Sequence, residues 1–122
     1  MADVSVIGAG SWGTALCVAL AENGHHVTLW SISESEIEML RADHEHKEKL
    51  PGVKLPDDML FTSDLKAAVD GKEVLVMAVP SPFVKSTSAS LKEFYQDGMR
   101  LLIYQLTQEH YFQKLIKEQE LS

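Results

Sequence analysis

Three glycines near the N-terminus stand at the G-x-G-x-x-G spacing that is typical of phosphate-binding turns: Gly8, Gly10 and Gly13. They follow the β-branched run 4–7 and precede a helical pattern over residues 11–23, so the motif lies where a strand passes into a helix. The first glycine allows a tight turn, the second lets a pyrophosphate approach the backbone, and the third lets the helix pack closely on the strand. The motif predicts a dinucleotide site at a helix N-terminus. A tight turn without a ligand is the alternative.

The residues after a second predicted strand, 26–30, indicate which dinucleotide would bind. An acidic residue there usually bonds the ribose 2′-hydroxyl of NAD, whereas an arginine suits the 2′-phosphate of NADP. No arginine or lysine lies between Trp30 and Met39, and Glu34 and Glu36 would repel a 2′-phosphate. The local charge therefore favours NAD, with NADP as the alternative.

Serine stands at position 31, where the usual acidic residue would be expected. Ser31 could bond a ribose hydroxyl, or it could face water as a helix cap, and both roles stay open. Ser33 and Ser35 are further candidates to cap a helix that carries Ile37 and Leu40.

The segment 79–83 is a further candidate to line the site. It includes Pro80 and Phe83 and follows an almost wholly apolar run, 74–79. In open α/β sheets, ligands bind at the carboxyl ends of strands, near the point where the strand order reverses. This rule places the segment beside the glycine turn. Phe83 could then lie against an adenine, or alternatively pack into the core.

The order of the predicted elements indicates the fold class. Apolar runs predict strands over 4–7, 26–30, 74–79 and 101–104, and helical patterns cover 11–23, a segment after Ser33 or Ser35, 63–69, 82–94 and the residues from Thr107. Residues 45–60 carry many charges and three breakers, and predict an irregular surface connection. We expect an α/β, Rossmann-type domain over 1–104, with a mostly parallel sheet and helices on both faces, and a C-terminal helical tail over 105–122.

Composition narrows the class of protein. The net charge of −7 and the pI near 5.1 disfavour binding to a nucleic-acid backbone. No run approaches the roughly 20 apolar residues of a membrane helix, and the first residues do not resemble a signal peptide. Cys17 is the single cysteine, so an internal disulfide is impossible. We therefore expect a cytoplasmic protein without a membrane segment.

Other residues that could do chemistry give weaker signals. His44 and His46 form an H-x-H pair in a charged segment, but no further ligand stands at a fixed spacing, so we expect a solvated surface and no metal site. Lys85 is expected to be a solvated helix residue. No residue is assigned a catalytic role.

Four segments occur in a distinctive order: VIGAGSWGTAL, LAENGHHVTLW, LPGVKLP and VLVMAVPS. Together, over about residues 4–98, they resemble the N-terminal domain of bacterial NAD(P)-dependent glycerol-3-phosphate dehydrogenase. The resemblance implies a Rossmann domain that binds NAD(P), and hydride transfer between the nicotinamide and glycerol 3-phosphate or dihydroxyacetone phosphate, a step that supplies a glycerophospholipid precursor. It also implies contacts to the cofactor from the whole loop Gly8–Gly13, with Ala9, Ser11 and Trp12 inside it, and contacts to the adenosine half from Ile32 and Phe83.

The sequence departs from the family pattern after Gly98. Members typically continue with a strand and Asn-x-x-Lys-Gly, whereas this chain has Leu106 where the lysine is expected. The family's second, helical domain, which carries the principal catalytic lysine, is not represented. We therefore expect this chain alone to bind the dinucleotide without turnover, with substrate binding only alongside the missing domain. The alternative is a stand-alone nucleotide-binding or interaction module, which could self-associate through an exposed sheet edge.

Overall fold

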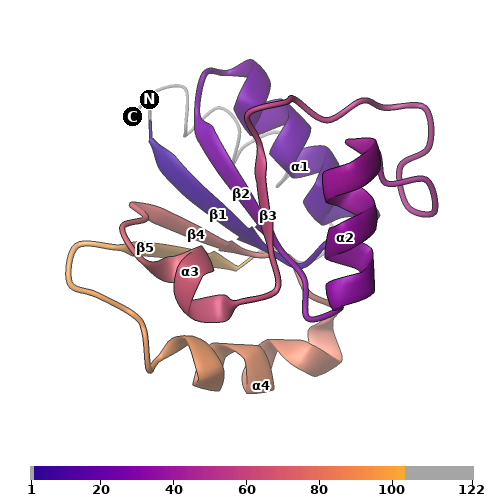
Figure 1. Cartoon of the computed structure of the whole chain (residues 1–122). Coiled ribbons are helices and arrows are strands. Elements are labelled where there is room, and N and C mark those ends of the chain that lie inside the picture. The colour runs from indigo at the N-terminus through magenta and orange to yellow at the C-terminus, as the bar shows by residue number, and fades with distance from the viewer. Residues whose placement is uncertain (1, 104–122) are drawn as a thin grey trace.

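A five-stranded parallel sheet in the order β3-β2-β1-β4-β5 forms the centre of the structure (Figure 1). The computed structural model describes residues 2–103. The elements along the chain are β1 (Asp3–Ile7), α1 (Ser11–Glu22), β2 (His26–Trp30), α2 (Glu34–Asp43), β3 (Leu60–Thr62), α3 (Leu65–Val69), β4 (Val74–Met77), α4 (Ser81–Leu91) and β5 (Arg100–Ile103).

The strand register shows why β1 is central. It pairs with β2 from Asp3↔His26 to Ile7↔Trp30, and on its other side with β4 from Val4↔Val74 to Ile7↔Met77. From β1, the next two strands in sequence, β2 and β3, lie successively farther out on one side of the sheet. The chain then crosses over, and β4 and β5 lie on the other side of β1. The strand order therefore reverses between β1 and β4. The predicted α/β, Rossmann-type parallel fold is confirmed.

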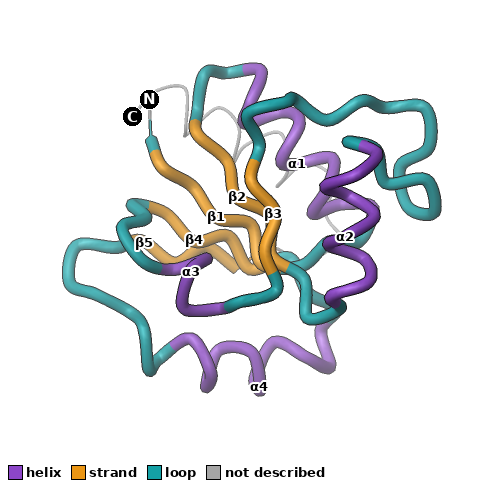
Figure 2. The backbone as a smooth tube through the Cα atoms, in the orientation of Figure 1, coloured by secondary structure: helices purple, strands orange, loops and turns teal. Residues whose placement is uncertain are grey.

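The alternation of side chains along β1 divides the core into two layers. Val4 and Val6 are fully buried in the cluster that also holds the apolar residues of α1 and α2. Ile7 belongs to the opposite cluster with residues of α3 and α4, and the buried Ser5 hydroxyl donates to the Ala68 carbonyl of α3. Figure 2 shows α1 and α2 on one side of the sheet and α3 and α4 on the other. Helices cover both faces, as the sequence predicts.

The connection between α2 and β3 differs from the expectation. The predicted irregular surface segment, 45–60, is largely irregular, but its side chains Leu55 and Met59 are buried in the core. Its last residue, Leu60, begins β3, an outer strand that was not predicted. β3 exists because it pairs with β2, from Thr28↔Leu60 to Trp30↔Thr62. A strand of three residues carries too little local pattern to be recognised.

The prediction of a solvated H-x-H pair is wrong. His46 is 0% exposed, and His44 is half-buried with its ring edge-on to Phe61 at a centroid distance of 5.6 Å. The backbone explains this: His44 caps α2 in the left-handed region, and its carbonyl accepts from Leu55 N–H at 2.6 Å, which folds the connection back over the helix. Within residues 2–103, no cluster of three or more His, Cys, Asp or Glu side chains is placed to hold a metal ion.

Two further expectations concern the C-terminal tail and the absence of a membrane-spanning helix. The C-terminal tail, 105–122, with the helix expected from Thr107, lies outside the described residues. In the described part of the chain, no helix is both long and apolar enough to cross a membrane.

His25 ties the turn after α1 to the start of the chain. Its Nδ1 accepts a hydrogen bond from Ala2 N–H at 3.0 Å, so this nitrogen carries no proton. Burial lowers the pKa of His25, and the carboxylate of Glu73 offsets this effect only in part. The folded state therefore binds a proton at this site less readily than the unfolded chain does.

We expect this difference to make stability depend on pH. The contribution is fully present above the ordinary histidine pKa of 6.5 and is lost as the pH falls below it, because the unfolded chain takes up the proton first. In urea titrations, the free energy of unfolding of the wild type should fall more steeply between about pH 7.5 and pH 5.5 than that of His25→Asn, which keeps an acceptor near Nδ1. Parallel curves for the two proteins would contradict this role of His25.

Candidate functional site

A cavity of about 330 Å³ opens at the carboxyl ends of β2, β1 and β4, where the strand order reverses. It is lined by Gly8, Ala9, Trp30, Ser31, Ile32, Val79, Pro80, Phe83, Ser86 and Thr87. Three segments far apart in the chain thus meet at one edge of the sheet: the turn after β1, the residues after β2, and the start of α4. The position is that of ligand sites in open α/β sheets, and the volume lies in the range of small-molecule pockets.

The turn after β1 is held from both sides. Gly8 N–H donates to the Trp30 carbonyl of β2 at 2.9 Å, and Ala78 N–H, after β4, donates to the Ile7 carbonyl at 2.8 Å. Gly8 has a φ of 124°, and a Cβ at this position would lie 2.7 Å from the Ala78 carbonyl oxygen. The turn therefore requires glycine for both conformation and space.

The other two glycines of the motif differ from each other. A Cβ on Gly13 would lie 2.0 Å from the Gly8 carbonyl oxygen, so α1 can pack on the turn only with glycine at this position. A Cβ on Gly10 would meet no protein atom within 4 Å, and Gly10 has an ordinary φ of −74°. The protein's own packing explains Gly8 and Gly13 but not Gly10. The open space beside the Gly10 backbone is where the motif predicts a phosphate.

The N-terminus of α1 suits an anion. The Thr14 N–H donates to the carbonyl of Gly10, the N-cap, at 3.0 Å. The first amides of a helix point outward along its axis, where they can meet an anion. The first turn has no acidic side chain that would neutralise the positive end of the helix dipole. The exposed Ser11 begins this turn, and Trp12 follows, half-buried against the core layer of α1 and α2.

The predicted site residues therefore fall into two adjoining groups. The cavity wall includes Gly8, Ala9, Ser31, Ile32, Pro80 and Phe83. Gly10, Ser11, Trp12 and Gly13 are not in the wall and form the beginning of α1 beside it. An anionic group beside α1 and a planar apolar group in the cavity would be neighbours in this arrangement.

Two apolar side chains at the cavity are exposed. Phe83 is 57% exposed and Ile32 is 84% exposed. Phe83 lies in the first turn of α4, where its N–H donates to the Pro80 carbonyl at 2.8 Å. The alternative that Phe83 packs into the core is therefore wrong. Exposed apolar side chains at the mouth of a cavity favour a flat ligand that would cover them.

Ser31 does not face water. It is only 5% exposed, its hydroxyl donates to the Glu36 carboxylate, and its oxygen accepts from Ser33 N–H at 3.2 Å. The cap of α2 is Ser33, whose hydroxyl oxygen accepts from Glu36 N–H at 3.2 Å. The water-facing cap role considered for Ser31 is therefore wrong, and its contact with a ribose stays a prediction.

The sequence analysis missed a residue that extends the hydrogen bonds of Ser31 and Glu36, namely His46. The second carboxylate oxygen of Glu36 lies 2.8 Å from Nε2 of His46, which comes from the irregular connection after α2. The Nδ1 of His46 accepts from Lys49 N–H at 3.3 Å. The only signal in the sequence was the histidine itself, because nothing in the local pattern shows that the connection folds back over α2.

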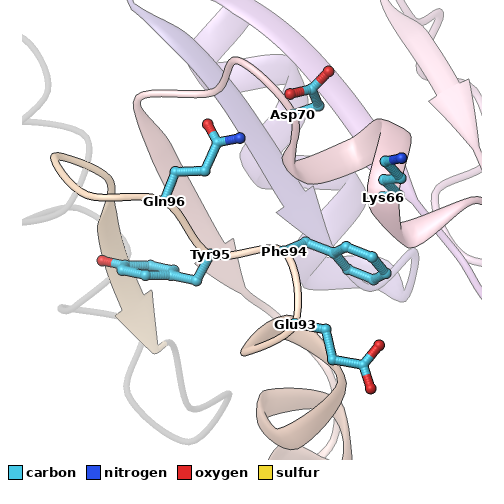
Figure 3. A pocket seen from close by; sticks show the side chains of 6 residues that line it. All are labelled: Lys66, Asp70, Glu93, Phe94, Tyr95 and Gln96. Atoms are coloured by element: carbon cyan, nitrogen blue, oxygen red, sulfur yellow. The ribbon is translucent and has the colours of Figure 1, made fainter.

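A second hollow, of about 220 Å³, lies near α3 and the turn after α4 (Figure 3). Its wall comprises Lys66, Asp70, Glu93, Phe94, Tyr95 and Gln96, and the rings of Phe94 and Tyr95 point in opposite directions. These residues precede β4 and β5, so the hollow lies toward the amino ends of the strands. This is the edge opposite to the one where α/β sheets bind ligands.

The contrast between Gly13 and Gly10 leads to a stability prediction. We expect Gly13→Ala to lower the free energy of unfolding by about 2–3 kcal/mol or more, because the methyl group must displace the Gly8 carbonyl. Gly10→Ala, the matched control, should cost less than about 1 kcal/mol, the difference between glycine and alanine at a helix N-cap. Urea titrations of the two variants check this, and equal losses would contradict the assigned packing.

Comparisons with known proteins agree with this geometry. Residues 3–118 match a family model described as the NAD-dependent glycerol-3-phosphate dehydrogenase N-terminus. Two relatives are named glycerol-3-phosphate dehydrogenase (NAD(P)+). The one from Agathobacter rectalis is 55% identical to this chain and the one from Fusobacterium nucleatum is 47% identical, each over 98 residues, which is 80% of this chain and 29% of the relative. The chain thus spans less than a third of the length of these relatives.

Solved structures show the same fold. A glycerol-3-phosphate dehydrogenase from Saccharomyces cerevisiae has a TM-score of 0.76 at 27% identity, over 83% of this chain and 32% of that one. A glycerol-3-phosphate dehydrogenase from Coxiella burnetii has a TM-score of 0.80 at 24% identity, over 99% and 38% respectively. The family resemblance noted in the four sequence segments is confirmed.

Proposed function

Because the chain belongs to the family described as the NAD-dependent glycerol-3-phosphate dehydrogenase N-terminus, we propose that it binds NAD(H), the dinucleotide that takes part in hydride transfer to or from the substrate. The observation that carries the proposal is Gly10. It is the one glycine of the motif that the protein's own packing does not require, and it borders open space at a helix N-terminus without acidic residues. A pyrophosphate beside Gly10 would explain both features.

The assignments of the binding residues follow from the two adjoining groups. The backbone of Gly10 and Ser11, with the hydroxyl of Ser11, would hold the pyrophosphate. The cavity between Ile32 and Phe83 would hold the adenosine half, since its wall is mainly apolar and contains no charged side chain. When bound, NAD(H) would exchange a hydride with glycerol 3-phosphate or dihydroxyacetone phosphate. The lack of a lysine or arginine in the wall supports NAD rather than NADP.

We further propose that this chain by itself does not turn over substrate. Reduction of a ketone needs a proton donor at the substrate oxygen in addition to the hydride. None of the cavity-lining residues in the described part of the chain has a titratable side chain. Substrate binding and catalysis would then require residues other than those that line this cavity. The single cysteine, Cys17, is buried, which fits a protein of the cytoplasm, where folding rarely depends on disulfides.

A second candidate function is a non-catalytic module that self-associates. Among residues 2–103, β3 is an outer strand that pairs with β2 alone, and its Leu60 is 63% exposed. An unpaired strand edge can accept another strand. Light scattering after size exclusion tests this candidate: a dimer at micromolar concentration that Leu60→Lys converts to a monomer would support it, and a wild-type monomer would contradict it.

The binding proposal predicts that the purified chain binds NADH in isothermal titration. Gly10→Val should weaken binding at least about tenfold, because the side chain would occupy the position of the pyrophosphate. Ala67→Val is the control, since it places the same β-branched side chain at an exposed position of α3, and it should bind as the wild type does. Absence of NADH binding by the folded wild type would overturn the proposal, and unchanged binding by Gly10→Val would overturn the placement of the pyrophosphate.

The proposal on turnover predicts no dihydroxyacetone phosphate-dependent oxidation of NADH by the purified chain, measured as the loss of NADH absorbance. The reason is that no side chain of the cavity wall is an acid or base that titrates near neutral pH and could supply the proton. Loss of absorbance that requires the substrate and disappears in Gly10→Val would contradict it.

A further inference from the structure

A carboxylate reaches the end of β2 from the neighbouring helix. The positions directly after β2 hold Ser31, Ile32 and Ser33, none of which is acidic. Glu36, in the first turn of α2, instead turns back and accepts the hydroxyl hydrogen of Ser31. Because Ser31 lines the cavity, a negative charge lies one hydrogen bond behind the cavity wall.

The position of this carboxylate is determined by a buried partner. The side chain of Glu36 is 23% exposed, that of His46 is 0% exposed, and the distance between Glu36 Oε2 and His46 Nε2 is 2.8 Å. Since His46 Nδ1 accepts from Lys49 N–H, the imidazole proton is on Nε2 and is donated to the carboxylate. Ser31, Glu36 and His46 together form what we call the Glu36 network.

The Glu36 network contains one carboxylate and no lysine or arginine. A neutral imidazole and a hydroxyl donate hydrogen bonds to the carboxylate without cancelling its charge. Among residues 2–103, Glu36 has no ion pair with a lysine or arginine. Glu36 lies in the first turn of α2, near the positive end of the helix dipole.

We propose that Glu36 is the residue that selects the cofactor, and that His46 is the positioning residue that holds it; this rests on the proposed function. A ribose 2′-hydroxyl at the end of β2 can donate a hydrogen bond to the network. A 2′-phosphate brings close to two negative charges and no donor, and it would face Glu36 with no cation in the cavity wall. The network thus does from the helix what an acidic residue at the strand end does in other dinucleotide-binding sheets. The ligand class that it selects is a dinucleotide with a free adenosine 2′-hydroxyl.

The test compares the dissociation constants of NADH and NADPH for the full chain. The wild type should prefer NADH by at least about tenfold, and Glu36→Gln should reduce this preference by about tenfold, mainly through tighter NADPH binding. Glu34→Gln is the matched control, because it removes the same charge from an exposed position two residues earlier in the same helix. It should leave the ratio within about twofold of the wild type, since exposed charges are screened.

His46→Asn tests the positioning role. It should lower the NADH preference in the same direction as Glu36→Gln, because the carboxylate loses the donor that holds it against Ser31. A merely structural defect would weaken both cofactors together and leave their ratio unchanged, and that result would overturn the role of His46. Ser31→Ala provides a second variant, with little change in volume, that should also lower the ratio.

The outcomes separate the two proposals. If the folded wild type binds neither dinucleotide, the proposed function fails and the inference fails with it. If the wild type binds NADH and Gly10→Val abolishes binding, while Glu36→Gln leaves the ratio of the two constants unchanged, the proposed function stands and the selection by Glu36 is overturned. A wild type that binds NADPH as tightly as NADH also overturns it.

Discussion

The close contact between the start of α1 and the turn after β1 is the constraint on which the site depends. Gly13 lies so near the Gly8 carbonyl that only a hydrogen atom fits between them, and Gly8 itself has no room for a side chain against Ala78. These contacts hold the start of α1 against the turn after β1, at the edge of the sheet where the strand order reverses. Gly10 is then the one glycine of the motif whose backbone stays open to a ligand.

The charges and apolar surfaces around this point are arranged as a dinucleotide would require. The amides and the positive dipole end of α1 are suited to the anionic centre of such a ligand. The exposed rim formed by Ile32 and Phe83 is suited to its flat apolar end. The Glu36 carboxylate lies behind the wall at the end of β2, where a further phosphate would be repelled. Each feature comes from a different segment, and the parallel sheet brings them to one edge.

Much of this arrangement could be predicted from patterns of neighbouring residues in the sequence. The spacing of Gly8, Gly10 and Gly13 after a β-branched run predicted the turn and the helix, because strand and helix periodicity differ within a few residues. The same reasoning placed Phe83 after a buried strand, although it left open whether the ring packs inside. It could not identify β3, whose three residues form a strand only because β2 offers a partner. It also placed His46 in solvent, since the residues around it are charged.

The sequence by itself determined the fold class, the glycine-rich turn and the family, because these depend on residues that are close together in the chain or occur in a recognisable order. Tertiary structure alone decided which of the three glycines is free for a ligand, since that depends on the distance to Ala78 and to the turn itself. It also decided that Ser31, Glu36 and His46 form one hydrogen-bonded network. Their contact requires α2 and the connection after it to fold back toward the end of β2, and no local pattern encodes that return.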